Sequence, residues 1–303
     1  MIKQYTRFTP MKWYILLLIL AGGLALLLPP DPQTLSHLDI SSSTYRLATF
    51  LLLIPYGIIW YAAFYAYAKL REYISYLGDS REGKAFRKIT IGMGILAFGL
   101  ILPTIVSLIM GSAILERDST NAASAIVNRY LVLLFPLISL LFISSGTSSL
   151  VSATKIRVNS MGLRLLAVPF LLLSATFVYL VMHDYIIHRS SYPINSFFLL
   201  ITIVVPYLYT WFLGFISSFE LWKYSRLVKG VLYKKFSFQF SLGISVAIVG
   251  SIAIQFISST VAIRVSKTLY PLLVVDYMLL IIVAIGLALV ALATQKLKKI
   301  EEV

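Results

Sequence analysis

Eight apolar runs follow one another along the chain, separated by short polar segments. Each run reaches the roughly 20 residues that an α-helix needs to cross about 30 Å of hydrocarbon. Because a bilayer core offers no hydrogen-bond partners to an open backbone, such runs are predicted to be helical. The pattern predicts an all-α, polytopic integral membrane protein with eight transmembrane helices, in which residues 1–303 form a single membrane domain. The runs lie near residues 12–30, 46–68, 89–113, 124–150, 163–184, 196–219, 239–263 and 270–294.

The composition agrees with this pattern. Of the 303 residues, 59% are hydrophobic and 13% are charged, whereas soluble domains contain about 45–50% and about 25% respectively. A soluble chain this apolar would have too little polar surface to face water, so we expect the lipid bilayer to be its main partner. The connections between the runs leave no room for a separate soluble domain. The net charge of +14 would suggest a nucleic-acid partner in a soluble chain, but we expect none here because the charges follow the predicted topology.

The positive charges alternate between successive connections. Twenty of the 26 Lys and Arg residues lie at the two termini and in the connections after the second, fourth and sixth runs. By the positive-inside rule, this bias places both termini in the cytoplasm of a multi-pass protein of the cell membrane. The resulting basic inner face could also contact anionic lipid headgroups. The remaining six are Arg46, Arg117, Arg129, Arg189, Arg264 and Lys267.

Two stretches in different halves of the chain resemble each other. "IPYGIIWYAAFYAYAKLREY" begins at residue 54 and "VPYLYTWFLGFISSFELWKY" begins at residue 205, a shift of 151 that we call the repeat shift. The same shift equates Lys84 with Lys235, whereas for the last run it becomes about 140, with Gly146 facing Gly286. We interpret this as a tandem duplication, with residues 1–154 and 155–303 as two four-helix repeats in the same orientation, related by an axis along the membrane normal. Chance similarity between apolar sequences is the alternative.

Prolines and glycines recur within this repeat. Pro55 and Pro206 each remove a backbone donor, so the second and sixth runs are expected to kink at equivalent depths. A kinked helix can gate a pore, although most kinks are purely structural. Paired glycines in the third and seventh runs lie seven residues apart on one helix face, where they would permit close packing against a neighbouring helix. These glycines are Gly92, Gly99, Gly243 and Gly250.

Two charged residues lie inside the predicted spans. Arg129 and Asp276 fall at similar depths in the fourth and eighth runs, and charges buried in lipid are normally paired. An Arg129–Asp276 contact between the repeats is therefore the sharpest site hypothesis, with Arg264 as the alternative cation. The pair could contact a substrate or ion, or it could only orient the helices. Snorkelling of each charge to the headgroups is a third interpretation.

Uncharged polar residues could line a path beside this pair. "SSGTSS" at 144–149 places hydroxyls, including those of Ser145 and Thr147, in the inner half of the fourth run. Such hydroxyls more often bond the carbonyl one turn back. Gln255 is a weaker candidate of the same kind. So is Glu220, which we expect to lie near water, where a lipid headgroup or Lys223 would balance its charge.

Recognisable catalytic or cofactor-binding chemistry is missing from the sequence. The chain has no cysteine, and its three histidines fall in or beside predicted outer loops, so we expect no metal site and no cofactor. The segment "GDSREGKA" at 78–85 resembles a phosphate-binding loop, but Ala85 replaces the Ser or Thr that would hold magnesium. We expect no enzymatic activity; a lipid-modifying activity is the remaining alternative.

The architecture is compatible with two main function classes. Translocation of a small solute or ion at the interface of the two halves is favoured by the repeat, the paired prolines and the Arg129–Asp276 hypothesis. A membrane-embedded sensory or assembly module without transport is favoured by the minimal loops and by three-four spacing of apolar residues in the C-terminal tail. Homo-oligomerisation or a second membrane protein as partner is compatible with either class.

Overall fold

A computed structural model of the chain describes residues 42–113, 120–153, 205–264 and 270–301, together with isolated helical positions at Leu16, Leu20 and Leu172. The long ranges form six helices, and no strand occurs among them. The all-helical prediction is therefore confirmed for these ranges, whereas the first and fifth apolar runs lie outside them. The helices are α3 (Ser42–Leu77), α4 (Arg81–Ala113), α5 (Thr120–Ala153), α9 (Val205–Leu227), α10 (Val231–Arg264) and α11 (Tyr270–Glu301).

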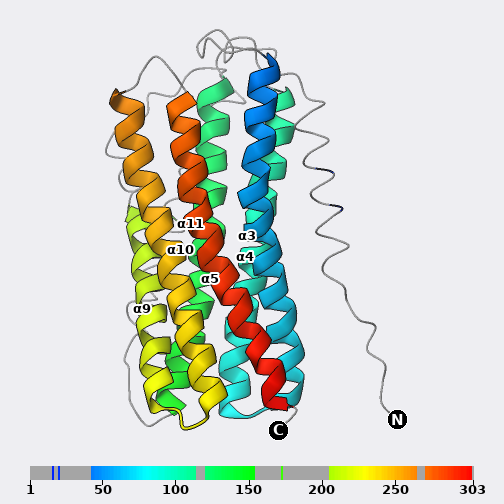
Figure 1. The fold of residues 1–303 in the computed structure, drawn as a ribbon, viewed down its shortest axis with the longest axis vertical. Coiled ribbons are helices and arrows are strands. Elements are labelled where there is room, and N and C mark those ends of the chain that lie inside the picture. The colour runs from blue at the N-terminus through cyan, green and yellow to red at the C-terminus, as the bar shows by residue number, and fades with distance from the viewer. Residues whose placement is uncertain are drawn as a thin grey trace.

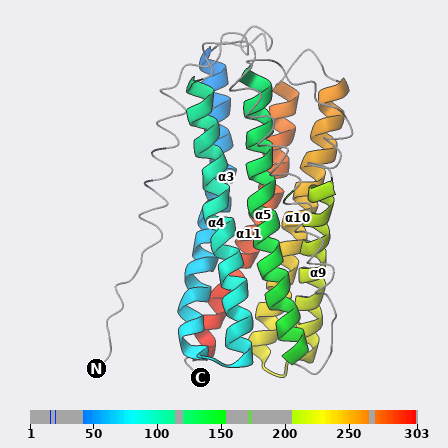
Figure 2. The same cartoon turned by 180° about the vertical axis from the view of Figure 1, so that it is seen from behind.

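The six helices pack side by side as an elongated bundle (Figures 1 and 2). Their main contacts form a closed ring: α3 packs on α4, α4 on α5, α5 on α9, α9 on α10, α10 on α11, and α11 again on α3. Exchanging α3, α4 and α5 for α9, α10 and α11 leaves this list of contacts unchanged. The α5/α9 and α11/α3 contacts therefore join the first three described helices to the last three.

The described surface of the bundle carries long apolar strips. On α11, Met278, Ile285 and Leu292 are exposed at seven-residue spacing, and α9 exposes a similar series that includes Leu208 and Phe212. Windows in α5, α10 and α11 are long and apolar enough to cross a membrane: Leu134–Ser152, Val231–Ile254 and Met278–Leu297. Exposed apolar patches of this extent require lipid or a partner to cover them.

Glycines allow the closest helix contacts. A Cβ atom placed on Gly92 of α4 would lie 2.7 Å from the carbonyl oxygen of Ser139 and 3.1 Å from the backbone nitrogen of Ile143, both in α5. A Cβ atom on Gly243 of α10 would lie 2.7 Å from the carbonyl oxygen of Gly286 and 2.8 Å from the backbone nitrogen of Val290, both in α11. Gly250 likewise lies against the backbone nitrogen of Val283, so three of the four predicted close-packing glycines lie against neighbouring backbone, which no larger residue could approach as closely.

The segment that resembles a phosphate loop is a tight connection between two helices. Gly78 follows the last residue of α3 with a φ of 56°, the left-handed conformation that commonly terminates a helix. The hydroxyl of Ser80 then accepts a hydrogen bond from the backbone N–H of Gly83 at 2.9 Å, which caps the start of α4. The two glycines and the serine are explained by helix termination and capping.

The two predicted kink residues differ in their positions. Pro55 lies inside α3, as expected. Pro206 is the second residue of the described part of α9, and the residues that precede α9 lie outside the described ranges. An equivalent kink at Pro206 therefore stays a prediction.

Basic residues gather at one end of the bundle. The α3–α4 and α9–α10 connections lie at this end, beside the C-terminal end of α11, at the bottom of Figure 1. Arg81 and Lys84 at the start of α4 are exposed there, as are Arg226 and Lys229 beside the α9–α10 connection. We call this the basic end. Its orientation toward the cytoplasm stays a prediction.

Candidate functional site at the two seams

Two seams join the halves of the described bundle: the α5/α9 seam and the α3/α11 seam. At the α5/α9 seam the carboxylate of Glu220 is buried, with 3% of the residue exposed. Thr147 donates a hydrogen bond to its Oε2 atom at 2.5 Å, and Ser148 donates one to its Oε1 atom. Both donors belong to α5, so this polar contact links the two halves directly.

The local sequence explains why these hydroxyls face α9. Gly146 lies against the backbone of α4, where an added Cβ would be 2.7 Å from the carbonyl oxygen of Ala85. The next two residues along the helix, Thr147 and Ser148, are therefore turned away from α4 and toward α9. Thr147 also bonds the carbonyl oxygen of Ser144, at 3.1 Å.

The burial of Glu220 corrects one expectation from the sequence. We expected this carboxylate near water, balanced by a headgroup or by Lys223; instead it is buried and receives hydrogen bonds from α5. Position along a helix indicates depth but not rotation about the helix axis, and rotation decides whether a side chain meets water or a neighbouring helix. Burying a carboxylate is costly unless hydrogen bonds or charges compensate for lost water, and the two hydroxyls supply part of that compensation.

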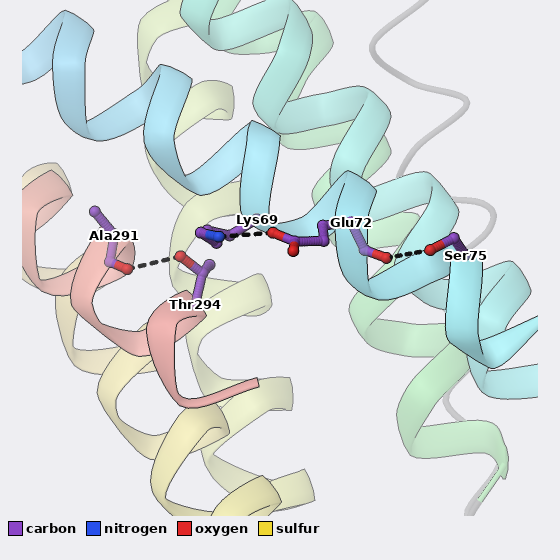
Figure 3. A network of polar contacts seen from close by, with 5 residues as sticks. All are labelled: Lys69, Glu72, Ser75, Ala291 and Thr294. Atoms are coloured by element: carbon purple, nitrogen blue, oxygen red, sulfur yellow. Dashed lines mark hydrogen bonds and ion pairs between the residues drawn. The ribbon is translucent and has the colours of Figure 1, made fainter. Parts of the chain in front are cut away.

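The α3/α11 seam carries a different set of polar residues (Figure 3). The ammonium group of Lys69 pairs with the carboxylate of Glu72 at 2.6 Å, and both side chains are partly exposed. On α11 the buried hydroxyl of Thr294 donates to the carbonyl oxygen of Ala291 at 2.6 Å. The repeat shift equates Lys69 with Glu220, so the two seams carry opposite charges at corresponding positions of the proposed repeat.

Residues that are separated by the repeat shift tend to be buried to similar extents. Leu70 and Leu221 are both buried, as are Ile89 and Phe240, whereas Ile91 and Leu242 are 43% and 45% exposed. Corresponding positions of α3 and α9, and of α4 and α10, therefore tend to face the same way within the bundle. Further buried pairs are Trp60 and Trp211, Tyr73 and Tyr224, Ala85 and Phe236, Met93 and Ile244, and Ala97 and Ile248.

Buried tyrosines lie near the basic end, beyond the apolar runs of α3 and α9. The Tyr73 hydroxyl hydrogen-bonds the Tyr233 hydroxyl of α10. Burial raises the pKa of Tyr73 well above its ordinary value, with a smaller contribution from that bond. Burial also raises the pKa of Tyr224, and the negative charge of Glu82 adds to the effect. These phenols remain protonated in the folded protein to a higher pH than an exposed tyrosine.

A groove of about 450 Å³ runs along the outer face between α9 and α10. Serines form part of its lining: Ser218 Oγ lies 2.9 Å from Ser241 Oγ and 2.6 Å from Ser245 Oγ. The other lining residues are Phe215, Phe219, Trp222, Phe238 and Leu242. Nothing in the sequence pattern alone indicates this groove, because its aromatic residues look like ordinary membrane-helix residues.

The residues predicted from the sequence are only partly brought together. Thr147 reaches the α5/α9 seam. Ser145 is half-buried, and its carbonyl oxygen accepts a hydrogen bond from the Ser149 hydroxyl at 2.8 Å. Arg129, Asp276 and Gln255 belong to α5, α11 and α10, but their side chains lie outside the described part, so the Arg129–Asp276 contact stays a prediction.

No other protein guides the interpretation of the site. No protein-family model, curated protein or solved structure matches the chain. Within the described residues, no group of three or more His, Cys, Asp or Glu side chains could hold a metal ion. The arguments below therefore depend on the geometry of the seams and the groove.

Proposed function

We propose that this chain is a multi-pass protein of the cell membrane, with both ends in the cytoplasm, and that it translocates a small ion or solute at the interface of two four-helix halves. The observation that carries the proposal is the buried Glu220 carboxylate, held by hydroxyls of the opposite half at the α5/α9 seam. Ionisable groups buried in membrane bundles are expensive and commonly mark ion or substrate pathways.

The chemistry of this cluster suits reversible binding of a proton or small cation. A carboxylate accepts hydrogen bonds or binds a cation, whereas a protonated carboxyl group also donates one. The hydroxyls of Thr147 and Ser148 can both donate and accept, so they can hydrogen-bond Glu220 in either charge state. Because the cluster joins two halves, a change of charge on Glu220 would alter the contact between them.

The division into two halves is supported by contacts as well as by sequence. The ring of helix contacts is unchanged when α3–α5 are exchanged for α9–α11, and burial recurs at the repeat shift in the first two helix pairs. Since an interface between repeats is a common place for transport sites, the seams are the natural position for a path.

The glycine contacts indicate which residues of α11 correspond to which residues of α5 in the proposed repeat. This correspondence differs from the shift of about 140 that the sequence suggests. Gly92 lies against Ser139 and Ile143, whereas Gly243 lies against Gly286 and Val290. Gly286 thereby corresponds to Ser139, and Val290 to Ile143. The same register pairs Thr147 with Thr294, which make the same backbone hydrogen bond, and it is the register that we propose.

The proposal is tested with the full chain reconstituted in proteoliposomes. Internal pH, Na⁺ and K⁺ indicators would follow flux under an imposed gradient and membrane potential. We expect wild-type flux to be strongly reduced by Glu220→Gln, which keeps the shape of the side chain but removes its charge. Asp79→Asn, a matched change of a carboxylate whose side chain is 85% exposed, should transport normally. Absence of wild-type flux for protons, Na⁺ and K⁺ would contradict the proposal, as would undiminished flux in Glu220→Gln.

The same assay addresses the alternative pathway residues. Asp276→Asn should reduce flux if the predicted Arg129–Asp276 contact belongs to the path. Normal flux in Asp276→Asn together with loss in Glu220→Gln would limit the functional site to the α5/α9 seam.

A second function, that of an assembly or sensory module, is favoured by the filled core. Near the basic end, large side chains from four helices are completely buried: Leu70, Phe86, Tyr224, Phe236 and Phe240. A module that only holds partner helices needs no passage, and the apolar outer faces could receive such partners. Co-purification of a stoichiometric membrane protein with a chain that conducts nothing would favour this function.

A further inference from the structure

The groove between α9 and α10 differs from an ordinary lipid-facing helix surface. Its volume of about 450 Å³ falls within the ~300–1,000 Å³ range of small-molecule sites. Phe219 and Phe238, one from each helix, are 61% and 51% exposed. Between the helices, Ser218 bonds Ser241 and Ser245, which satisfies these hydroxyls within the protein. The result is an apolar surface groove with aromatic walls, which suits a hydrocarbon chain.

At the corresponding place between the described parts of α3 and α4, an aromatic side chain occupies the space between the helices. There the ring of Tyr67 in α3 lies over Gly94 in α4, since a Cβ atom on Gly94 would be 3.0 Å from that ring. Phe98 packs edge-on against the same ring, with centroids 6.3 Å apart. The repeat shift equates Tyr67 with Ser218 and Gly94 with Ser245. Replacement of a large ring by a hydroxymethyl group leaves the space that forms the groove.

Positive charge lies at the end of the groove nearest the basic end. The guanidinium group of Arg226 is 3.8 Å from the ring centroid of Trp222, a groove residue. On α10, Lys234 is exposed and lies four residues before Phe238, which places it on the same helix face. Within residues 205–264 the only carboxylate is Glu220, and it is buried against α5. Exposed cations near the groove are therefore not balanced by an exposed carboxylate from either helix.

We propose that this groove binds one acyl chain of an anionic phospholipid, whose phosphate group contacts Arg226 and Lys234. The aromatic walls supply apolar contact area for the chain, and the two cations select a negatively charged headgroup over a zwitterionic one. Juxtamembrane cations attract anionic lipids with a strength that corresponds to about fivefold in affinity for each charge near the membrane surface. The proposal is independent of whether the chain transports an ion.

The test uses quenching of tryptophan fluorescence by brominated acyl chains. The full-length protein is reconstituted in phosphatidylcholine vesicles that contain a minor fraction of either dibrominated phosphatidylglycerol or dibrominated phosphatidylcholine. The contribution of Trp222 is the difference between wild type and Trp222→Phe, and each variant is normalised to its own signal in unbrominated lipid. We expect Trp222 to be quenched at a several-fold lower fraction of the anionic lipid than of the zwitterionic lipid.

Two double variants, each with a control variant, separate the roles of charge and space. Arg226→Gln with Lys234→Gln should remove the preference for the anionic lipid, whereas Arg81→Gln with Lys84→Gln, on α4 at the same end, should retain it. Ser218→Tyr with Ser245→Gly copies the Tyr67 and Gly94 arrangement and should close the groove. This variant should reduce quenching by both lipids, while Ser245→Ala, which leaves the groove open, should not.

Three outcomes would overturn the proposal. Equal quenching by the two lipids would show that the headgroup is not selected. Loss of the preference in the α4 control variant would indicate general attraction to the basic end. Unchanged quenching in the folded Ser218→Tyr/Ser245→Gly variant, with folding checked by helical circular dichroism and a monodisperse elution profile, would show that the chain does not enter the groove.

Discussion

Thr147 of α5 and Thr294 of α11 make the same hydrogen bond: each donates to the carbonyl oxygen three residues earlier in its own helix, at 3.1 and 2.6 Å. Both threonines are completely buried. They differ in what the adjoining helix presents, because Thr147 also bonds Glu220 of α9, whereas the corresponding position of α3 is Lys69. The two seams thus share a backbone arrangement but differ in the group beside it: a buried carboxylate at one, and an ammonium group paired with Glu72 at the other.

Removing the hydroxyls around Glu220 should destabilise the folded protein. Thr147→Val with Ser148→Ala deletes two donors to a buried carboxylate, and loss of such partners costs about 1–3 kcal/mol per buried group. Adding Glu220→Leu should recover part of this loss, because an apolar side chain needs no partner at that position. The measurement is the midpoint of denaturant unfolding in detergent, with exposed Ser152→Ala as control. Equal stability of the double variant and wild type would contradict the conclusion that these hydroxyls stabilise the buried Glu220 carboxylate.

The all-helical fold of the described ranges could be predicted from the sequence, because apolar runs of this length constrain a chain in lipid to form helices. The register that we propose between α5 and α11 could not, since Gly146 and Gly286 look alike in sequence but face different partners: Ile89 and Ala85 for one, Gly243 and Ala247 for the other. The shift suggested by the sequence and the one supported by the contacts differ by about two helical turns, so both place the same face of the helix toward its neighbour. Only the contacts therefore distinguish them.

The candidate site was only half visible in the sequence. The hydroxyls of "SSGTSS" indicate a polar site in the sequence, and Thr147 does lie at the α5/α9 seam. The hydrophobic pattern predicts that Glu220 lies near water, because it directly follows the sixth apolar run. It is, however, the only carboxylate in α9. A lone acidic residue at the end of an apolar run can face either headgroups or a neighbouring helix, and the hydrophobic pattern does not distinguish them.

Alanine at Gly92 and at Gly243 should destabilise the protein to similar extents. Gly→Ala inside a helix gains up to about 1 kcal/mol in helix propensity, but here the new methyl group would lie 2.7 Å from a carbonyl oxygen of the next helix. Backbone cannot move aside as a side chain can, and overpacking costs about 1–3 kcal/mol, so we expect a net loss in thermal unfolding experiments. Gly94→Ala is the control, because its methyl group would meet only the ring of Tyr67. A stabilised Gly92→Ala would show that the helices are less close than described.

Alkaline pH should destabilise the basic end through Tyr73 and Tyr224. Burial raises the pKa of both phenols, so above pH ~10 the unfolded state releases protons that the folded state retains. The folded state then binds more protons, and the free energy of unfolding falls as pH rises, by up to about 1.4 kcal/mol per pH unit for each tyrosine. Below pH ~10 this contribution is constant.

The control for this pH dependence is an exposed tyrosine. Unfolding midpoints measured between neutral pH and pH ~11 should fall less steeply in Tyr73→Phe/Tyr224→Phe than in wild type. Tyr76→Phe, at a position that is 62% exposed, should keep the wild-type slope. A double variant with the same slope as wild type would show that these phenols do not titrate differently on unfolding.

The proposed topology can be tested with single cysteines, because the chain contains none of its own. Asp79→Cys and Lys229→Cys lie in connections at the basic end, and Ser191→Cys lies in a predicted outer loop. If the positive-inside rule holds, a membrane-impermeant maleimide should label the thiol at position 191 on intact cells, and those at positions 79 and 229 only after permeabilisation. Labelling of 79 and 229 on opposite sides would be incompatible with the ring of helices, whereas labelling of both from outside would reverse the orientation and leave the bundle unchanged.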